Sequence, residues 1–159
     1  IGKGNVMDAT QKTFISSTFW TERIGPSAAL KTLEVMEKTK SWEIITKIGI
    51  EIKHKWEEIA KSNNLEIKHK GLPALAGFDF KSISNLKYKT FITQEMLKQG
   101  ILAANSIYVC LNHNKEVLNI YFDKLDKIFR TISLCEQGKL NINDLIIDEV
   151  CHADFKRLN

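Results

Sequence analysis

A run of hydroxyl side chains, Ser16-Ser17-Thr18, lies shortly before a predicted helix start at Gly25-Pro26-Ser27. Hydroxyl groups and backbone N–H groups bind phosphate oxygens together, so a hydroxyl run that leads into a helix can form a phosphate cradle. Proline marks the helix start because its missing N–H has no intrahelical partner at that position. The same residues also suit an ordinary polar loop, and composition alone favours that interpretation.

Cysteine and histidine occur together at two places, and their spacing bears on metal binding. Cys110 and His113 are separated by two residues, and Cys151 is followed directly by His152. Zinc sites normally combine two close Cys pairs, or a Cys pair with a His pair, and neither combination is present. Cys110 also falls at the end of a predicted buried strand, where cysteine commonly serves as a small hydrophobic residue. The sequence therefore predicts no metal site.

Familiar catalytic motifs are absent from the sequence. There is no Gly-x-Ser-x-Gly nucleophile elbow, no phosphate-loop lysine of the Walker type and no His-Glu-x-x-His zinc motif. The motifs alone leave open both an enzyme whose key residues lie elsewhere and a non-catalytic α+β binding module.

The composition is that of a globular protein. Hydrophobic residues make up 43% of the 159 residues and charged residues 26%, which excludes a disordered or collagen-like chain. The net charge is only +4 and the lysines are scattered, whereas nucleic-acid binding would concentrate basic residues on one element. The longest apolar runs, such as Leu145-Ile146-Ile147, are too short to span a membrane. Three sparse cysteines suit a reducing cytoplasm better than a disulfide framework.

The hydrophobic pattern predicts helices and short strands after about residue 24. Apolar residues recur at three- and four-residue steps in the helices, and Asn114 caps the clearest one. β-branched and aromatic residues mark the strands. The predicted helices cover about 25–38, 41–62, 86–99 and 115–137, the predicted strands about 65–69, 74–80 and 107–111, and a short helical turn about 143–147.

This order of elements predicts an α+β fold in which a small sheet has helices on one side. No internal repeat or low-complexity run interrupts it. The domain boundary is predicted near Lys38 to Ser41, where the first helix passes to the second.

The first thirty residues resemble a known family of enzymes. Two pieces are similar to the segment just downstream of the cofactor lysine in class-III aminotransferases, which use pyridoxal 5′-phosphate (PLP). They are Ile1–Met7 and Ser16–Glu22, and the second leads into the helix that begins Gly25–Ala29. The resemblance is nearest to the glutamate-1-semialdehyde 2,1-aminomutase branch. It implies a fold-type-I PLP enzyme.

The remainder is similar to the C-terminal small domain of the same family. The matching pieces are Gly77–Phe80, Met96–Gly100, Ile101–Ser106 and Val150–Leu158. The resemblance implies that residues 1–39 are the C-terminal end of the large PLP-binding domain with its linking helix. Residues 40–159 are then the small domain, with a small antiparallel sheet and helices on one side.

The resemblance also implies roles for particular side chains. Thr18 would donate to the cofactor phosphate of the neighbouring subunit in a homodimer, and Ser17 would support it. Such an enzyme converts a small amino or keto substrate, and PLP serves as the electron sink in the reaction. The small domain closes over that substrate, so Asn105 is a candidate substrate-binding residue, with a simple polar turn as the alternative.

The cofactor lysine of the family should precede the matched segment. Lys3 and Lys12 align with downstream positions, so the resemblance implies no catalytic residue within this chain. The chain begins with Ile1 rather than methionine and has no secretory leader pattern, which suggests a fragment. We therefore expect it to be inactive in transamination by itself.

The substrate stays open between several possibilities. The aminomutase branch resembles this chain at Ser106-Ile107-Tyr108 but usually continues with a glutamate where Val109 stands, and residues 106–114 contain no acidic side chain. An aminotransferase of amino-sugar or surface-polysaccharide biosynthesis is therefore an alternative to the aminomutase.

Overall fold

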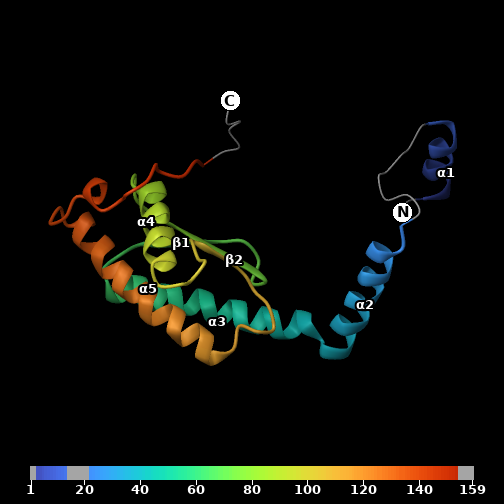
Figure 1. The fold of residues 1–159 in the computed structure, drawn as a ribbon, viewed down its shortest axis with the longest axis horizontal. Coiled ribbons are helices and arrows are strands. Elements are labelled where there is room, and N and C mark those ends of the chain that lie inside the picture. Colours follow the sequence, from blue (N-terminus) through green and yellow to red (C-terminus); the bar gives the residue numbers. More distant parts are fainter. Residues whose placement is uncertain (1–2, 14–21, 154–159) are drawn as a thin grey trace. The chain divides into compact units, whose positions relative to one another are not determined.

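The computed structural model describes residues 3–13 and 22–153. The chain divides into two compact units, Ile1–Thr39 and Lys40–Asn159 (Figure 1).

The first unit is helical in its described part. It contains α1 (Gly4–Met7), the 3₁₀ helix η1 (Asp8–Lys12) and α2 (Ile24–Thr39). Helix α2 starts at Ile24, so Pro26, predicted at the first helical position, is its third residue. It still lies in the first turn, where a backbone N–H has no intrahelical partner. Helix α2 buries none of its residues, and Leu30 is 70% exposed.

The second unit is an α+β layer, as the sequence predicts. Its helices are α3 (Ser41–Ser62), α4 (Asn85–Leu97), α5 (Lys115–Glu136) and the 3₁₀ helix η2 (Ile142–Asp144). Its strands are β1 (Ile67–Lys70), β2 (Leu75–Phe80) and β3 (Ser106–Tyr108), which form an antiparallel sheet in the order β1-β2-β3. The predicted fold class is confirmed.

Strand β2 supplies the side of the sheet that packs against the helices. Ala76, Phe78 and Phe80 alternate along it and are at most 6% exposed. The ring of Phe78 lies 4.8 Å from that of Trp56 on α3, measured between centroids, and 5.8 Å from that of Phe129 on α5. The ring of Phe80 lies 5.4 Å from that of Tyr88 on α4, again measured between centroids. All the long helices of this unit therefore pack on one face of the sheet.

One buried hydrogen bond links two of these helices through the core. The indole nitrogen of Trp56 donates to the hydroxyl of Tyr121 on α5 at 2.9 Å. Both side chains are almost fully buried, and burial raises the pKa of Tyr121 above its ordinary value. The bond satisfies a donor that would otherwise be left without a partner in the apolar interior.

The segment from Leu145 to Cys151, which follows α5, runs back along α4 (Figure 1). The side-chain amide of Gln94 donates to the carbonyl of Leu145 at 2.9 Å and accepts the backbone N–H of Ile147 at 2.8 Å. Farther along, the backbone N–H of Cys151 donates to the hydroxyl of Thr90 at 3.0 Å. Helix α4 thus holds this segment by side-chain contacts to its backbone.

Strand β3 is shorter than the predicted strand 107–111. The backbone N–H of His113 bonds the carbonyl of Cys110 at 3.2 Å, so the chain turns there. Pairing with β2 nevertheless extends to Val109, whose N–H donates to the carbonyl of Ala74 at 3.0 Å.

Gly49 allows an unusually close approach between α3 and the β1–β2 loop. A Cβ atom at this position would lie 1.9 Å from the carbonyl oxygen of Pro73. That atom belongs to the backbone and cannot rotate away, so helix and loop would have to separate to admit even a methyl group.

We expect Gly49→Ala to lower the free energy of unfolding by about 1–3 kcal/mol, the usual cost of overpacking a filled site. Thr46→Ala, at an exposed position of the same helix, should change it by about 0.5 kcal/mol or less. Chemical denaturation of both variants measures the difference. Equal stability of the two variants would show that the contact with Pro73 is not a constraint.

Candidate functional site

The predicted cofactor residues Ser17 and Thr18 lie outside the described residues. Their roles therefore stay predictions. The predicted substrate residue Asn105 is described, in the turn between α4 and β3.

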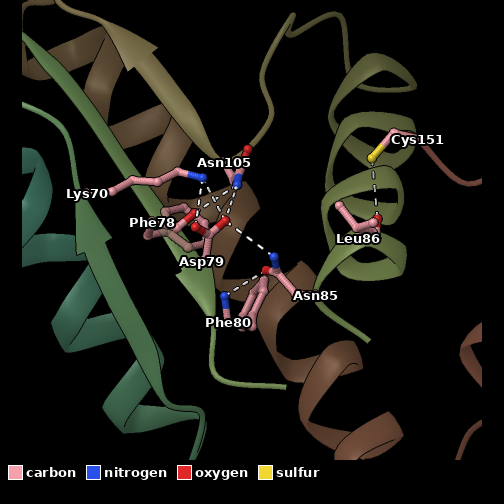
Figure 2. A network of polar contacts seen from close by, with 8 residues as sticks. All are labelled: Lys70, Phe78, Asp79, Phe80, Asn85, Leu86, Asn105 and Cys151. Carbon is pink, nitrogen blue, oxygen red and sulfur yellow. Dashed lines mark hydrogen bonds and ion pairs between the residues drawn. The ribbon is translucent and has the colours of Figure 1, made fainter. Parts of the chain in front are cut away.

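Asn105 is buried and its side-chain nitrogen is fully engaged within the protein (Figure 2). This nitrogen donates to the carbonyl of Phe78 at 2.8 Å and to Oδ1 of Asp79 at 3.0 Å. The backbone carbonyl of Asn105 in turn accepts the N–H of Phe78 at 3.0 Å. Asn105 thus fastens the turn before β3 to the neighbouring strand β2.

Asp79 is the centre of this polar cluster. Its two carboxylate oxygens accept hydrogen bonds from the Lys70 ammonium group at 2.7 and 2.8 Å, and Asn85 donates to Oδ1 at 3.3 Å. Burial alone would raise the pKa of Asp79, but the hydrogen bonds from Lys70, Asn85 and Asn105 outweigh it and hold the pKa below its ordinary value of 3.8. Asp79 is therefore ionised at neutral pH and poorly suited to donate a proton.

The cluster depends on a glycine and on the strand register. Lys70 on β1 pairs with Gly77 on β2, and its side chain crosses over Gly77 to reach Asp79. A Cβ at Gly77 would lie 3.1 Å from the Lys70 Cγ atom, which is tighter than an ordinary contact. The side-chain oxygen of Asn85 accepts the Phe80 N–H at 2.8 Å and so joins the start of α4 to the same group.

A depression of about 320 Å³ lies along the segment that leads into β3. Ser106, which follows Asn105, contributes to its lining together with Leu102, Tyr108 and Val117. Tyr108 is 78% exposed and Leu102 is 92% exposed, so the depression has an apolar and open rim. Sequence reasoning did not single out this rim.

The cysteine and histidine pairs do not assemble with other ligands. Within residues 3–13 and 22–153 no group of three or more His, Cys, Asp or Glu side chains is arranged to hold a metal ion. The Nδ1 atom of His113 instead accepts the backbone N–H of Cys110 at 3.2 Å. The three cysteines are free thiols.

The described residues by themselves do not fit a PLP site. None of their lysines is buried, whereas an amine that anchors the cofactor needs a desolvated position. The polar cluster around Asp79 is closed by its own hydrogen bonds. None of the helices in these ranges combines the length and apolar character needed to cross a bilayer.

Comparisons with known proteins found similarity both in sequence and in fold. No family profile matches the chain. The chain is 24% identical over 124 residues to 3-aminobutyryl-CoA aminotransferase of Cloacimonas acidaminovorans (strain Evry). This alignment covers 74% of the chain and 30% of that protein. It superposes with a TM-score of 0.77 on the FumI protein of Sphingopyxis sp. MTA144, solved in its PLP internal aldimine form, at 18% identity.

The structural match covers 92% of this chain and 36% of FumI. The chain therefore spans about a third of the length of the proteins it resembles. The likeness in structure establishes that this chain has the fold of part of a PLP enzyme.

The Lys70–Asp79 pair should make stability depend on acidity. The pKa of Asp79 is lower in the folded state than its ordinary value of 3.8. The ionised carboxylate therefore stabilises the folded state fully at pH values above 3.8, and this stabilisation is lost as the pH falls through the folded-state pKa. We expect Asp79→Asn to cost about 1–2 kcal/mol of unfolding free energy at neutral pH. Denaturation of both proteins between about pH 7 and pH 3 should show this difference shrinking towards acid.

Asp123→Asn is the matched control, because Asp123 is exposed on α5 and forms no ion pair with the described residues. Its unfolding free energy should follow that of the wild type over the whole pH range. A difference for Asp79→Asn that stays constant down to the most acidic point would contradict the assigned role of the ionised carboxylate.

Proposed function

We propose that this chain is the C-terminal part of a PLP-dependent aminotransferase of class III. Residues 1–39 would form the end of the large domain, and residues 40–159 the small domain. The observation that carries the proposal is the structural match to a PLP enzyme over 92% of the chain. The sequence match to an aminotransferase supports it independently.

The cofactor of this enzyme is PLP, and bound PLP supplies an electron sink for carbanion chemistry. In this chain Thr18 would donate its hydroxyl to the cofactor phosphate of the neighbouring subunit, and Ser17 would add a second donor. A hydroxyl bonded to a charged phosphate contributes about 1.5–3 kcal/mol. The assembly is therefore a homodimer, and it works in the cytoplasm.

The amine that anchors the cofactor lies outside this chain in the proposal. None of the described lysines is fully buried, which supports this assignment, because an amine that anchors the cofactor needs a desolvated position. The chain itself then contributes no catalytic residue. It contributes the phosphate donors and one wall of the substrate pocket.

The substrate is a small amino or keto compound. The name of the Cloacimonas relative favours an amine carried on an acyl thioester. Residues 106–114 contain no carboxylate that would correspond to the glutamate of the glutamate-1-semialdehyde aminomutases, so plain amino transfer is favoured over the aminomutase reaction. Amino-sugar substrates of polysaccharide biosynthesis are the further alternative.

Asn105 has a more limited role in this proposal than the sequence suggests. Its side-chain nitrogen is committed to Phe78 and Asp79. It would shape the substrate side of the small domain by fixing the turn that leads to Ser106 and β3.

A non-catalytic binding module is the second candidate function. The closed hydrogen bonding around Asp79 favours it for the chain in isolation, as does the lack of a fully buried lysine among the described residues. It predicts a full-length protein that is indifferent to PLP.

The full-length protein that carries these residues should be yellow and show a visible absorbance band of bound PLP that borohydride bleaches. Thr18→Ala should weaken PLP binding by about tenfold to a hundredfold, which corresponds to the loss of one charge-assisted hydrogen bond. Fluorescence titration of the apoprotein with PLP measures this affinity.

Thr13→Ala is the control, because the Thr13 hydroxyl bonds the carbonyl of Thr10 at 3.3 Å within the same turn. It should leave the affinity for PLP unchanged. A colourless full-length protein with no affinity for PLP would refute the proposed function and favour the binding module. A yellow protein in which Thr18→Ala and Thr13→Ala bind PLP equally would refute only the role of Thr18.

A further inference from the structure

Strand β1 lies at the edge of the sheet and has β2 as its neighbour. The backbone N–H of Lys81 donates to the carbonyl of Glu66 at 2.9 Å, which makes these two residues a hydrogen-bonded pair just before β1. Hydrogen-bonded and non-hydrogen-bonded pairs alternate along an antiparallel ladder. Ile67 and His69, opposite Phe80 and Phe78, are therefore in non-hydrogen-bonded pairs.

It follows that the backbone N–H and C=O groups of Ile67 and His69 point away from β2. We call these groups the β1 edge. No hydrogen bond joins them to any residue in the described ranges. A row of unpaired backbone groups of this kind is a template for another strand.

A cavity of about 560 Å³ lies next to the β1 edge. His69 lines it from β1, and Ile50, Lys53, Glu57 and Lys61 line it from one side of α3. These helix residues recur at steps of three and four, so they form a continuous stripe. The cavity gives room for the side chains of an added strand on the face of the sheet that carries His69.

His69 also has an unpaired ring nitrogen. Its Nε2 atom lies 3.2 Å from the Glu57 carboxylate, whereas its Nδ1 atom is buried and has no hydrogen-bond partner among the described residues. This nitrogen lies inside the protein, so the β1 edge offers the backbone groups of His69 rather than its imidazole for contact.

The charges around the β1 edge favour an acidic partner. Lys68 is exposed and forms no ion pair with the described residues, and the Lys53 ammonium group donates to the carbonyl of Gly71 rather than to a carboxylate. The glutamates of the cavity are each paired with a lysine, because Glu57 lies 3.5 Å from the Lys61 ammonium group and Glu58 lies 2.9 Å from that of Lys55. The unmatched charges are thus positive.

A second copy of the same strand would fit poorly. Pairing β1 with itself antiparallel about His69 would set Lys68 of each copy opposite Lys70 of the other, and like charges across a ladder are destabilising. The charges along β1 therefore favour an acidic strand at this edge over a second copy of β1.

We propose that the β1 edge is a docking site for an extended, acidic segment of another polypeptide. The segment adds a strand to the sheet through the backbone groups of Ile67 and His69. Its carboxylates face Lys68 on the face of the sheet opposite His69, and its alternate side chains enter the cavity beside α3. In strand addition the main-chain hydrogen bonds give affinity and such pockets give specificity. This inference is independent of the proposed enzymatic function.

The probe is a fluorescein-labelled peptide that alternates valine with glutamate, and its control alternates valine with lysine. Fluorescence anisotropy with the full-length protein should show saturable binding of the acidic peptide and at least about tenfold weaker binding of the basic one. Hydrogen–deuterium exchange with mass spectrometry should show slower exchange in residues 65–71 when the acidic peptide is bound.

Two variants test the backbone contact. His69→Pro removes an N–H of the β1 edge and should weaken binding of the acidic peptide by about tenfold or more. His69→Val removes the same imidazole but keeps the N–H, so it should retain binding. If His69→Pro proves unfolded by circular dichroism, the exchange experiment on the wild-type protein decides.

The proposal is overturned if both peptides bind equally, if neither binds, or if protection from exchange appears only outside residues 65–71. It is also overturned if the protein without peptide forms dimers whose dissociation exposes residues 65–71, as measured by exchange at increasing dilution. In that case a second copy occupies the edge.

Discussion

The alternation of side chains along β2 is the constraint on which the rest of the structure depends. Phe78 and Phe80 point to one face, where they contact aromatic rings of all the long helices of the second unit. Asp79, between them, points to the other face and binds Lys70, Asn85 and Asn105. A shift of register by one residue would exchange the faces, placing a carboxylate in the core and phenylalanines outside it. The hydrophobic packing and the polar cluster therefore enforce the same register.

Strand β2 thus carries the core residues on one face and the polar cluster on the other, and the polar cluster links the fold to the proposed function. The polar cluster ties the start of α4, the strand β1 and the turn at Asn105 to β2, so the residues that enter β3 are fixed by contacts on several elements. If the small domain forms one wall of a substrate pocket, that wall is rigid before a substrate arrives. Pre-organised positions of this kind lower the entropy that binding must overcome.

The sequence predicted the fold well because its strongest signals are local. The helices 41–62 and 115–137 agree with α3 and α5 to within a residue or so, since each carries an unbroken apolar stripe. Strand β3 was predicted too long because the apolar run continues past Tyr108 while the chain already turns at Cys110. Pattern alone does not show where pairing with a neighbouring strand ends.

The contacts of the candidate site were less accessible from the sequence. Asn105 was singled out as a polar residue before a strand, but its bonds to Phe78 and Asp79 depend on how β2 lies beside the turn. The Lys70–Asp79 pair requires both the register of β1 against β2 and the absence of a side chain at Gly77. An aspartate between two phenylalanines in a strand was the available signal, because aspartate is disfavoured there without partners. Ser17 and Thr18 stay predictions.

The contact between Gly49 and Pro73 has a mechanical consequence. Helix α3 has 22 residues and is about 33 Å long, at about 1.5 Å per residue. The backbone of the β1–β2 loop is seated directly against the backbone of this helix, with no side chain between them to yield. Because neither backbone can yield at this contact, we expect a displacement of one end of α3 to carry the β1–β2 hairpin with it.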